Sequence, residues 1–199
     1  MSKAVLISIR PQWCQKIASG EKTIEVRKTK PKLDTPFKCY IYCTMPDAKD
    51  PHQILEIHGA GGKIRKANGE VIGEFVCDCV TPLYNVCMDN WERLAGGLHN
   101  IEKELVNQAC LTEAKLHTYA GGKNCFAWHI SDLRIYDVPK DLNEFWLPPE
   151  LYCEKERCGG CPYDQVADVN GEYSFDCEWK RPLTRPPQSW CYVDDVQAK

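Results

Sequence analysis

Alternating apolar and polar residues open the chain and predict a strand followed by a helix. Val5, Ile7 and Ile9 are spaced two residues apart, so they share one face of a strand predicted over residues 4–10. Pro11 comes next and suits the first position of a helix, because its missing N–H would have no partner there. The chain therefore begins with a buried strand that leads directly into a short helix.

A second strand is predicted over residues 22–28, after a glycine at position 20 that stands where a helix C-cap belongs. The alternation of this strand directs Ile24 and Val26 inward. Its opposite face then carries Thr23, Glu25 and Arg27.

The rest of the pattern contains more strands than helices. The strands are predicted over residues 38–44, 71–80, 124–130 and 133–138, and a loop or hairpin insertion over 58–70. Helices are predicted over residues 83–94, 101–109 and 112–119, the last with Thr112 as its cap. Because the helices do not alternate regularly with the strands, we expect an α+β, mainly β fold: a small barrel with inserted helices.

The composition changes near Pro148 and Pro149, where the chain becomes rich in cysteine, proline and charge. We therefore predict a folded domain over residues 1–147 and a cysteine-rich extension over residues 148–199. The last stretch, RPPQSWCYVDD, offers Trp190, Tyr192 and Val193 as apolar anchors. It is expected to pack back on the barrel, and docking of a protein partner is the alternative.

Charge and cysteine content narrow the partners and the compartment. The formal net charge of -3 argues against strong binding to long nucleic acids by bulk attraction, so recognition of RNA would need a local pocket. The chain shows no signal peptide and no apolar run long enough for a membrane span. We therefore expect a cytoplasmic protein whose 13 cysteines are thiols and metal ligands rather than disulfides.

The residues around the second strand suggest a site for a nucleobase or a phosphate. Lys22 lies at a helix-to-strand turn, where a rigid backbone can direct it into a cleft, and in a dry pocket it could act as a base or nucleophile. Glu25 can accept a hydrogen bond from an exocyclic amine, and the fork of Arg27 suits a phosphate or a carbonyl edge. The alternative is a solvated strand face held together by ion pairs.

The segment LISIRPQWCQKIASGEKTIEVRK, residues 6–28, resembles the opening of ASCH domains: a strand, a helix with proline, and a Gly-x-Lys-Thr turn into a strand ending in Glu-x-Arg. The segments VIGEFVCDCV and NCFAWHISDLRIYDVP resemble later strands of that family, so the likeness covers roughly residues 3–145. It implies a PUA-like β-barrel with a cleft able to hold a nucleobase or RNA.

The resemblance also implies two kinds of chemistry. One small group of ASCH enzymes hydrolyses N4-acetylcytidine with a lysine, a threonine and a glutamate, and others have been linked to RNA cleavage. Lys22 matches that lysine, whereas Glu25 occupies the position of the threonine. The third residue stays open among Glu102, Glu104 and Glu113. Lys22 and Glu25 are therefore the candidate catalytic residues.

Further ligand-binding candidates flank the motif. The full set consists of Arg10, Trp13, Lys22, Thr23, Glu25, Arg27 and Tyr119. Tyr119 ends a helix beside a glycine turn, where an aromatic ring could stack on a base. Trp128 is expected in the core instead, and His129 is expected to point outward.

The extension contains the spacing C-x4-C-x2-C-x15-C, formed by Cys153, Cys158, Cys161 and Cys177, with Cys191 as a fifth candidate. Two thiolates separated by two glycines can hold one metal ion, and zinc would stabilise a segment with little apolar pattern. Free thiols, an iron–sulfur site and a redox dithiol are the alternatives. No organic cofactor is expected.

Three functions follow. The first is a module that binds RNA or a nucleotide through a nucleobase in the cleft. The second is a hydrolase, an amidohydrolase or ribonuclease, that uses Lys22 and Glu25. The third is a metal-stabilised adaptor for protein interactions.

Overall fold

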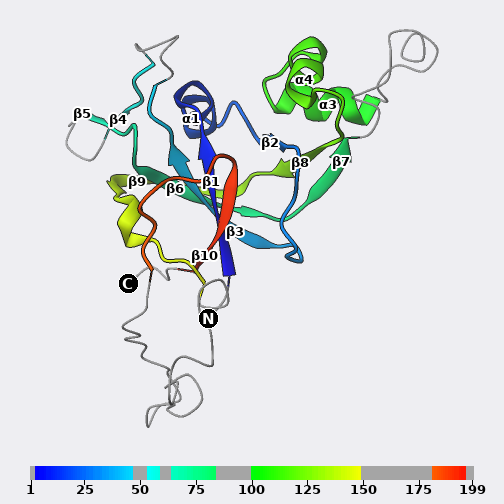
Figure 1. Ribbon diagram of the computed structural model, residues 1–199. Coiled ribbons are helices and arrows are strands. Elements are labelled where there is room, and N and C mark those ends of the chain that lie inside the picture. Colours follow the sequence, from blue (N-terminus) through cyan, green and yellow to red (C-terminus); the bar gives the residue numbers. More distant parts are fainter. Residues whose placement is uncertain (1–2, 47–52, 59–63, 84–99, 149–180, 196–199) are drawn as a thin grey trace, which may run out of the picture.

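The computed structural model describes residues 3–46, 53–58, 64–83, 100–148 and 181–195 (Figure 1). In chain order the elements are β1 (Lys3–Ile9), α1 (Pro11–Ala18), β2 (Ile24–Arg27), β3 (Phe37–Cys43), β4 (Glu56–His58), β5 (Ile64–Lys66), β6 (Val71–Cys77), β7 (Val80–Leu83), α3 (Asn100–Gln108), α4 (Glu113–Ala120), β8 (Cys125–His129), β9 (Ser131–Lys140), the 3-10 turn η1 (Leu142–Glu144) and β10 (Trp190–Asp194). The predicted mainly β, α+β class with inserted helices is confirmed.

The larger of the two main sheets contains five strands in the order β10-β1-β3-β6-β9. β1 and β3 run parallel, and the other neighbours are antiparallel. Both faces of β1 are buried: Val5 and Ile7 pack into one core, whereas Ala4 and Leu6 pack into another on the opposite face. A strand buried on both sides needs apolar residues at nearly every position, as residues 4–9 have.

The second sheet contains three strands in the order β2-β8-β7. Ile24 and Val26 of β2 pack in a core with residues of α3 and α4, as the alternation predicted. In the strand register Glu25 lies opposite Trp128 of β8, on the face of this sheet that does not carry Ile24 and Val26. Trp128 packs in the core of the five-stranded sheet. Glu25 and Arg27 are therefore directed between the two sheets instead of into solvent.

The strand predicted over residues 71–80 is in fact two strands. β6 ends at Cys77 in the five-stranded sheet, and β7 begins at Val80 in the three-stranded sheet. The chain changes sheets at Asp78 and Cys79. The helix predicted to start at Leu83 does not start there, because Leu83 ends β7; residues 84–94 lie outside the described residues.

The other predicted elements are confirmed. Pro11 starts α1, and the Thr112 side chain accepts a hydrogen bond of 3.2 Å from the Lys115 N–H at the start of α4. The insertion predicted over residues 58–70 contains the second strand of the β4–β5 hairpin. Trp128 is fully buried, and His129 is partly exposed and pairs with Asp78.

The C-terminal run packs back on the sheet, as predicted. β10 pairs antiparallel with β1, and Val193 is buried in the core on that face. Leu183 joins the same core and its N–H donates to the Phe145 carbonyl at 2.8 Å. Residues from beyond position 147 thus complete the sheet in which the N-terminal strand lies, and the division at residue 147 stays a prediction.

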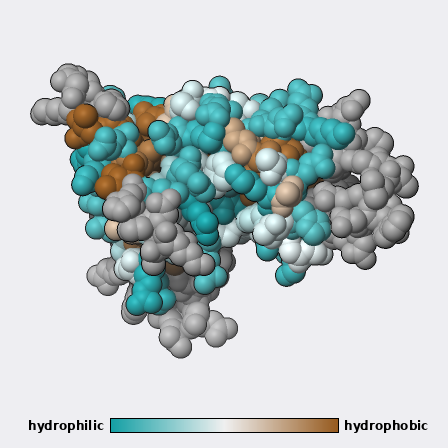
Figure 2. All heavy atoms as spheres, turned by 90° about the horizontal axis from the view of Figure 1, so that it is seen from above, coloured by the Kyte–Doolittle hydropathy of each residue, from teal (hydrophilic) through white to brown (hydrophobic). Residues whose placement is uncertain are grey.

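The surface seen from above is mostly hydrophilic (Figure 2). Hydrophobic side chains gather at the left of this view, on the side of β4 and β5. Met45, Ile54 and Ile64 are among the exposed large hydrophobic residues. None of the helices within the described ranges combines the length and the apolarity that crossing a membrane would require.

Candidate functional site

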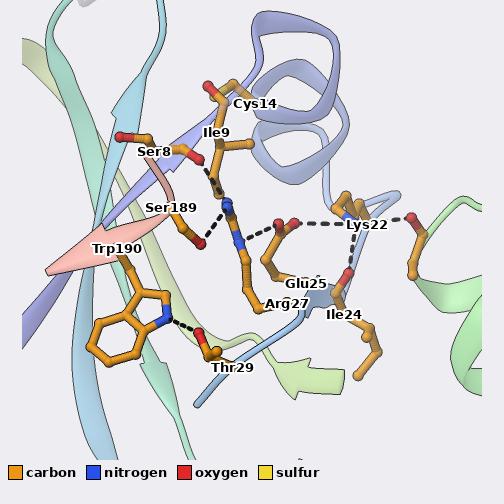
Figure 3. Close-up of polar contacts among 11 residues, drawn as sticks. Ser8, Ile9, Cys14, Lys22, Ile24, Glu25, Arg27, Thr29, Ser189 and Trp190 are labelled. Carbon is orange, nitrogen blue, oxygen red and sulfur yellow. Dashed lines mark hydrogen bonds and ion pairs between the residues drawn. The ribbon is translucent and has the colours of Figure 1, made fainter. Parts of the chain in front are cut away.

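Lys22 is 3% exposed, and its ammonium group is fully engaged. It donates hydrogen bonds to the Ile24 carbonyl at 2.7 Å and to the Ala109 carbonyl at 2.9 Å, and its Nζ lies 3.3 Å from Glu25 Oε2 (Figure 3). An ammonium has three donors, and three acceptors surround it here. The Trp13 ring, 5.3 Å from Nζ, adds a cation–π contact.

Ala109 follows the last residue of α3, which explains why Lys22 reaches it. The backbone turns left-handed at Cys110, with a φ of 56°, and the Leu111 N–H bonds to the Val106 carbonyl. The Ala109 carbonyl is among the last of the helix and has no following turn to donate to it. A cation at the negative end of the helix dipole is also favourable. Lys22 therefore links β2 to α3.

Glu25 joins Lys22 to Arg27. Its Oε2 faces Lys22, and its Oε1 lies 3.1 Å from Arg27 Nε. Only 9% of the Glu25 side chain is exposed, so both ion pairs are nearly removed from water. Buried charges persist only when they are paired and hydrogen-bonded, and this carboxylate has a cation on each side.

Arg27 fixes β2 to the start of the chain and to its end. Nη2 donates to the Ser8 carbonyl at 2.7 Å, and Nη1 donates to Ser189 Oγ at 3.4 Å. The second bond is long and therefore weak. Nε is within ion-pair distance of Glu25, but it has no hydrogen-bond acceptor among the described residues.

The remaining candidates lie around this network to different degrees. Trp13 contacts Lys22, and Tyr119 is 39% exposed with Lys28 Nζ 5.3 Å from its ring. Burial raises the pKa of Tyr119, while the charge of Arg27 lowers it and that of Glu25 raises it, so this phenol senses the charged pair. The Arg10 carbonyl accepts hydrogen bonds from the Trp13 and Cys14 N–H groups at the start of α1, and its exposed side chain forms no hydrogen bond or ion pair with the described residues.

Thr23 has a structural role in the backbone. Its N–H bonds to the Gln108 carbonyl at 3.0 Å, and its carbonyl accepts from Ile130 N–H at 2.9 Å. It thereby joins the start of β2 to α3 and to the end of β8. Among the possible third catalytic carboxylates, Glu104 and Glu113 are exposed on α3 and α4. The side chain of Glu102 lies outside the described residues.

Lys22, Glu25 and Arg27 thus form a buried network and not a solvated strand face. In this arrangement a nucleophilic role for Lys22 would require its ammonium to break two hydrogen bonds with carbonyls and to lose a proton. Sequence reasoning missed the partners Ser8, Ala109 and Ser189. Ser8 and Ala109 accept through their backbone carbonyls, which every residue type has, so the sequence does not mark them. No local pattern connects Ser189 to Arg27.

The arrangement of the sheets matches known crystal structures. The ASCH protein from Zymomonas mobilis superposes with a TM-score of 0.52 at 18% identity, over 96% of this chain and 88% of that chain. This chain has an ASCH fold. A serine-to-alanine mutant of the same Zymomonas mobilis protein gives a TM-score of 0.50 at 18% identity, over 96% of this chain and 89% of that one. No family model and no curated protein matches the sequence. The ASCH fold expected from residues 6–28 is confirmed, and at this identity the likeness concerns the fold alone.

The predicted metal ligands Cys153, Cys158, Cys161 and Cys177 lie outside the described residues, so the zinc site stays a prediction. Cys191, the fifth candidate, lies on β10. Burial raises the pKa of its thiol to about 11, so it is protonated at neutral pH. No group of three or more metal-ligating side chains is found within the described ranges.

Proposed function

We propose that this ASCH-fold protein binds RNA by holding one nucleobase against Glu25 and Arg27, with Tyr119 beside them. The observation that supports the proposal most is the fixed orientation of Glu25 and Arg27 within the buried network. A carboxylate and a guanidinium held side by side present an acceptor and donors in a defined geometry. That pattern complements a base edge that presents an amine donor beside acceptor atoms, as cytosine does with N4 beside N3 and O2.

Two features leave the network ready for a ligand. The bond of 3.4 Å from Arg27 Nη1 to Ser189 is weak enough to be exchanged for a ligand oxygen. Trp128 Nε1, on the strand that pairs with β2, is a buried donor that lacks an acceptor among the described residues. An unsatisfied buried donor costs about 1–3 kcal/mol, so a ligand that supplied an acceptor would gain from this deficit.

Binding of labelled 12-nucleotide RNAs by fluorescence anisotropy tests the proposal. We expect the Glu25→Gln variant to bind oligocytidine about tenfold or more weakly, because the amide replaces an acceptor oxygen with a donor. Its affinity for oligouridine, which has no exocyclic amine, should change much less. Glu56→Gln is the matched control, since Glu56 is exposed on β4, which belongs to a different sheet from β2.

An activity assay on the same protein tests the hydrolase hypothesis. Turnover of N4-acetylcytidine or cleavage of RNA that disappears in Lys22→Met, while the variant stays folded, would establish Lys22 as a catalytic residue. An equal loss of affinity for oligocytidine and for oligouridine in Glu25→Gln would contradict base recognition. No binding of either RNA by the wild-type protein would overturn the proposed function and favour the adaptor hypothesis.

A further inference from the structure

A strongly basic loop follows directly after the site. Residues 28–32 read Lys-Thr-Lys-Pro-Lys, and they continue β2 immediately beyond Arg27. Lys28, Lys30 and Lys32 are exposed, whereas Pro31 between them is buried. The chain as a whole carries a net charge of -3, so this is a local concentration of positive charge next to the buried network.

Among the described residues, no acidic side chain neutralises the three lysines of the basic loop. Within the described ranges, no carboxylate oxygen lies within ion-pair distance of Lys28, Lys30 or Lys32. Cations elsewhere do have such partners: Lys16 pairs with Glu21, Lys38 with Asp195, and Arg65 with Glu70. Clustered ammonium groups repel one another, so the loop keeps an unfavourable charge that an anionic partner would relieve.

The C-terminal strand holds this loop in place. Trp190 Nε1 donates to Thr29 Oγ1 at 3.0 Å (Figure 3), and Tyr192 Oη accepts a hydrogen bond of 2.7 Å from the Lys32 N–H. These contacts join residues that are 161 and 160 positions apart in the sequence. A loop fixed in advance loses less entropy when it binds, so its charges are available at a smaller cost.

The first lysine connects the loop to the base site. Lys28 Nζ lies 5.3 Å from the centre of the Tyr119 ring, and the pKa of Tyr119 responds to Arg27 and Glu25. Tyr119 therefore contacts the first lysine of the loop. Trp190 and Tyr192 are both partly exposed and contact the loop at Thr29 and Lys32. Aromatic rings interleaved with lysines are typical of surfaces that bind single strands, in which the bases stack and the phosphates face cations.

We propose that the basic loop, residues 28–32, binds the phosphate backbone of a single-stranded RNA whose base occupies the Glu25–Arg27 site. The inference rests on the proposed function and makes it more specific: the ligand is a strand of nucleotides and not a free nucleoside. One base would enter beside Tyr119, and the phosphates next to it would lie along Lys28, Lys30 and Lys32.

The salt dependence of binding tests this inference. Each phosphate contact on a single strand adds about 0.7 to the slope of log affinity against log salt concentration. The variant Lys28→Gln/Lys30→Gln/Lys32→Gln should therefore reduce the slope for a 12-nucleotide oligocytidine by about 2. Its affinity for cytidine monophosphate should change far less, because a mononucleotide does not reach along the loop.

The matched control removes the same charge from elsewhere, through Lys66→Gln/Lys103→Gln/Lys115→Gln, three exposed lysines outside the loop. Equal slopes for the two triple variants would overturn the inference and leave the proposed function intact, provided that the wild-type protein still binds RNA. An equal loss of affinity for the mononucleotide and for the 12-mer would also overturn it, since the loop would then act through the base site. A wild-type protein that binds no RNA would overturn both proposals.

Discussion

The buried ionic network is the feature of single residues that most affects stability. Lys22, Glu25 and Arg27 carry two positive charges and one negative charge in a region almost without water. Removing Glu25 would leave two cations without their anion, and removing Lys22 would leave Glu25 Oε2 and two backbone carbonyls without their donor. In an exposed pair such as Lys16–Glu21, water still solvates the remaining charge when the other residue is replaced.

We expect Lys22→Met to lower the free energy of unfolding by about 3 kcal/mol, because Glu25 loses one cation and the Ala109 carbonyl loses its donor. Urea denaturation at pH 7 measures this change. Lys16→Met is the control and should produce only a small change, since both partners of that pair are substantially exposed. A Lys22→Met variant as stable as Lys16→Met would contradict the buried network.

The Asp78–His129 pair gives the chain a pH-dependent contact where it changes sheets. Its Nδ1–Oδ1 distance is 2.6 Å, and this hydrogen bond lowers the pKa of Asp78 below its ordinary value. A lowered pKa in the folded state contributes stability above the pKa of the unfolded chain, which is about 3.9. That contribution is lost as the pH falls through the lower pKa of the folded state.

Urea titrations between pH 6 and pH 2.5 should therefore show a shallower acid loss of stability for Asp78→Asn than for the wild-type protein. The difference between the two proteins should be greatest near pH 6 and should shrink as the pH falls below about 4. Parallel curves over the whole range would show that the carboxylate does not pair with His129 in solution.

At the scale of elements, the C-terminal strand and the basic loop form one unit. β10 is an edge strand of the large sheet, yet its two aromatic residues also hold the segment between β2 and β3. The Trp190 ring lies 6.1 Å from that of Trp128, which connects this unit to the core. The order of the loop should thus depend on β10.

Amide hydrogen exchange provides the measurement for this dependence. Tyr192→Phe removes the oxygen that accepts from the Lys32 N–H, so exchange at Lys32 should become about five- to tenfold faster, as the loss of one hydrogen bond predicts. Tyr136→Phe is the matched control, because its hydroxyl bonds to Glu74 on another part of the sheet. If Lys32 exchanges at the same rate in both variants, Tyr192 does not restrain the loop.

The sequence predicted the elements better than their assignment to sheets. The alternation in residues 4–9 and the proline at position 11 are local features, and β1 and α1 follow from them. The run VIGEFVCDCV looks like one strand, because nothing in its residue types marks the change of sheet at Asp78 and Cys79. At this break Cys79 is exposed, whereas Cys77 at the end of β6 is buried.

The candidate site shows the same limit. Its charged members could be chosen from residues 20–27, but their burial depends on partners that are distant in sequence. The Ala109 carbonyl is 87 positions from Lys22, and Ser189 is 162 positions from Arg27. Because residue type alone favours a solvated strand face for such a trio, only tertiary structure distinguishes the two arrangements.

At the scale of the whole molecule, the two ends of the chain meet in one sheet. β1 lies between β10 and β3, so removing β10 would turn an interior strand into an edge. Ala4 and Leu6 would also lose Val193 and Leu183 as packing partners. A fragment ending at residue 147 would then expose apolar surface and unpaired backbone groups along β1.

We expect this fragment to unfold at a lower urea concentration than the full chain, or to aggregate. Near-ultraviolet circular dichroism and sedimentation velocity would distinguish the two results. The full chain with Val193→Ala offers an intermediate case, with a loss of about 1–2 kcal/mol from one small buried side chain. A fragment as stable and monomeric as the full chain would establish residues 1–147 as an independent domain.

The central claim is that the buried Glu25–Arg27 pair forms the base-binding part of an RNA site. The most direct test is an NMR titration of isotope-labelled protein with a 12-nucleotide oligocytidine, observing the Arg27 Nε–H and Trp128 Nε1–H signals. Trp128 Nε1 lacks an acceptor among the described residues and Arg27 Nε faces Glu25, so both signals should shift when a base edge approaches the pair. RNA binding that leaves these two signals unchanged and shifts only surface lysines would contradict the claim.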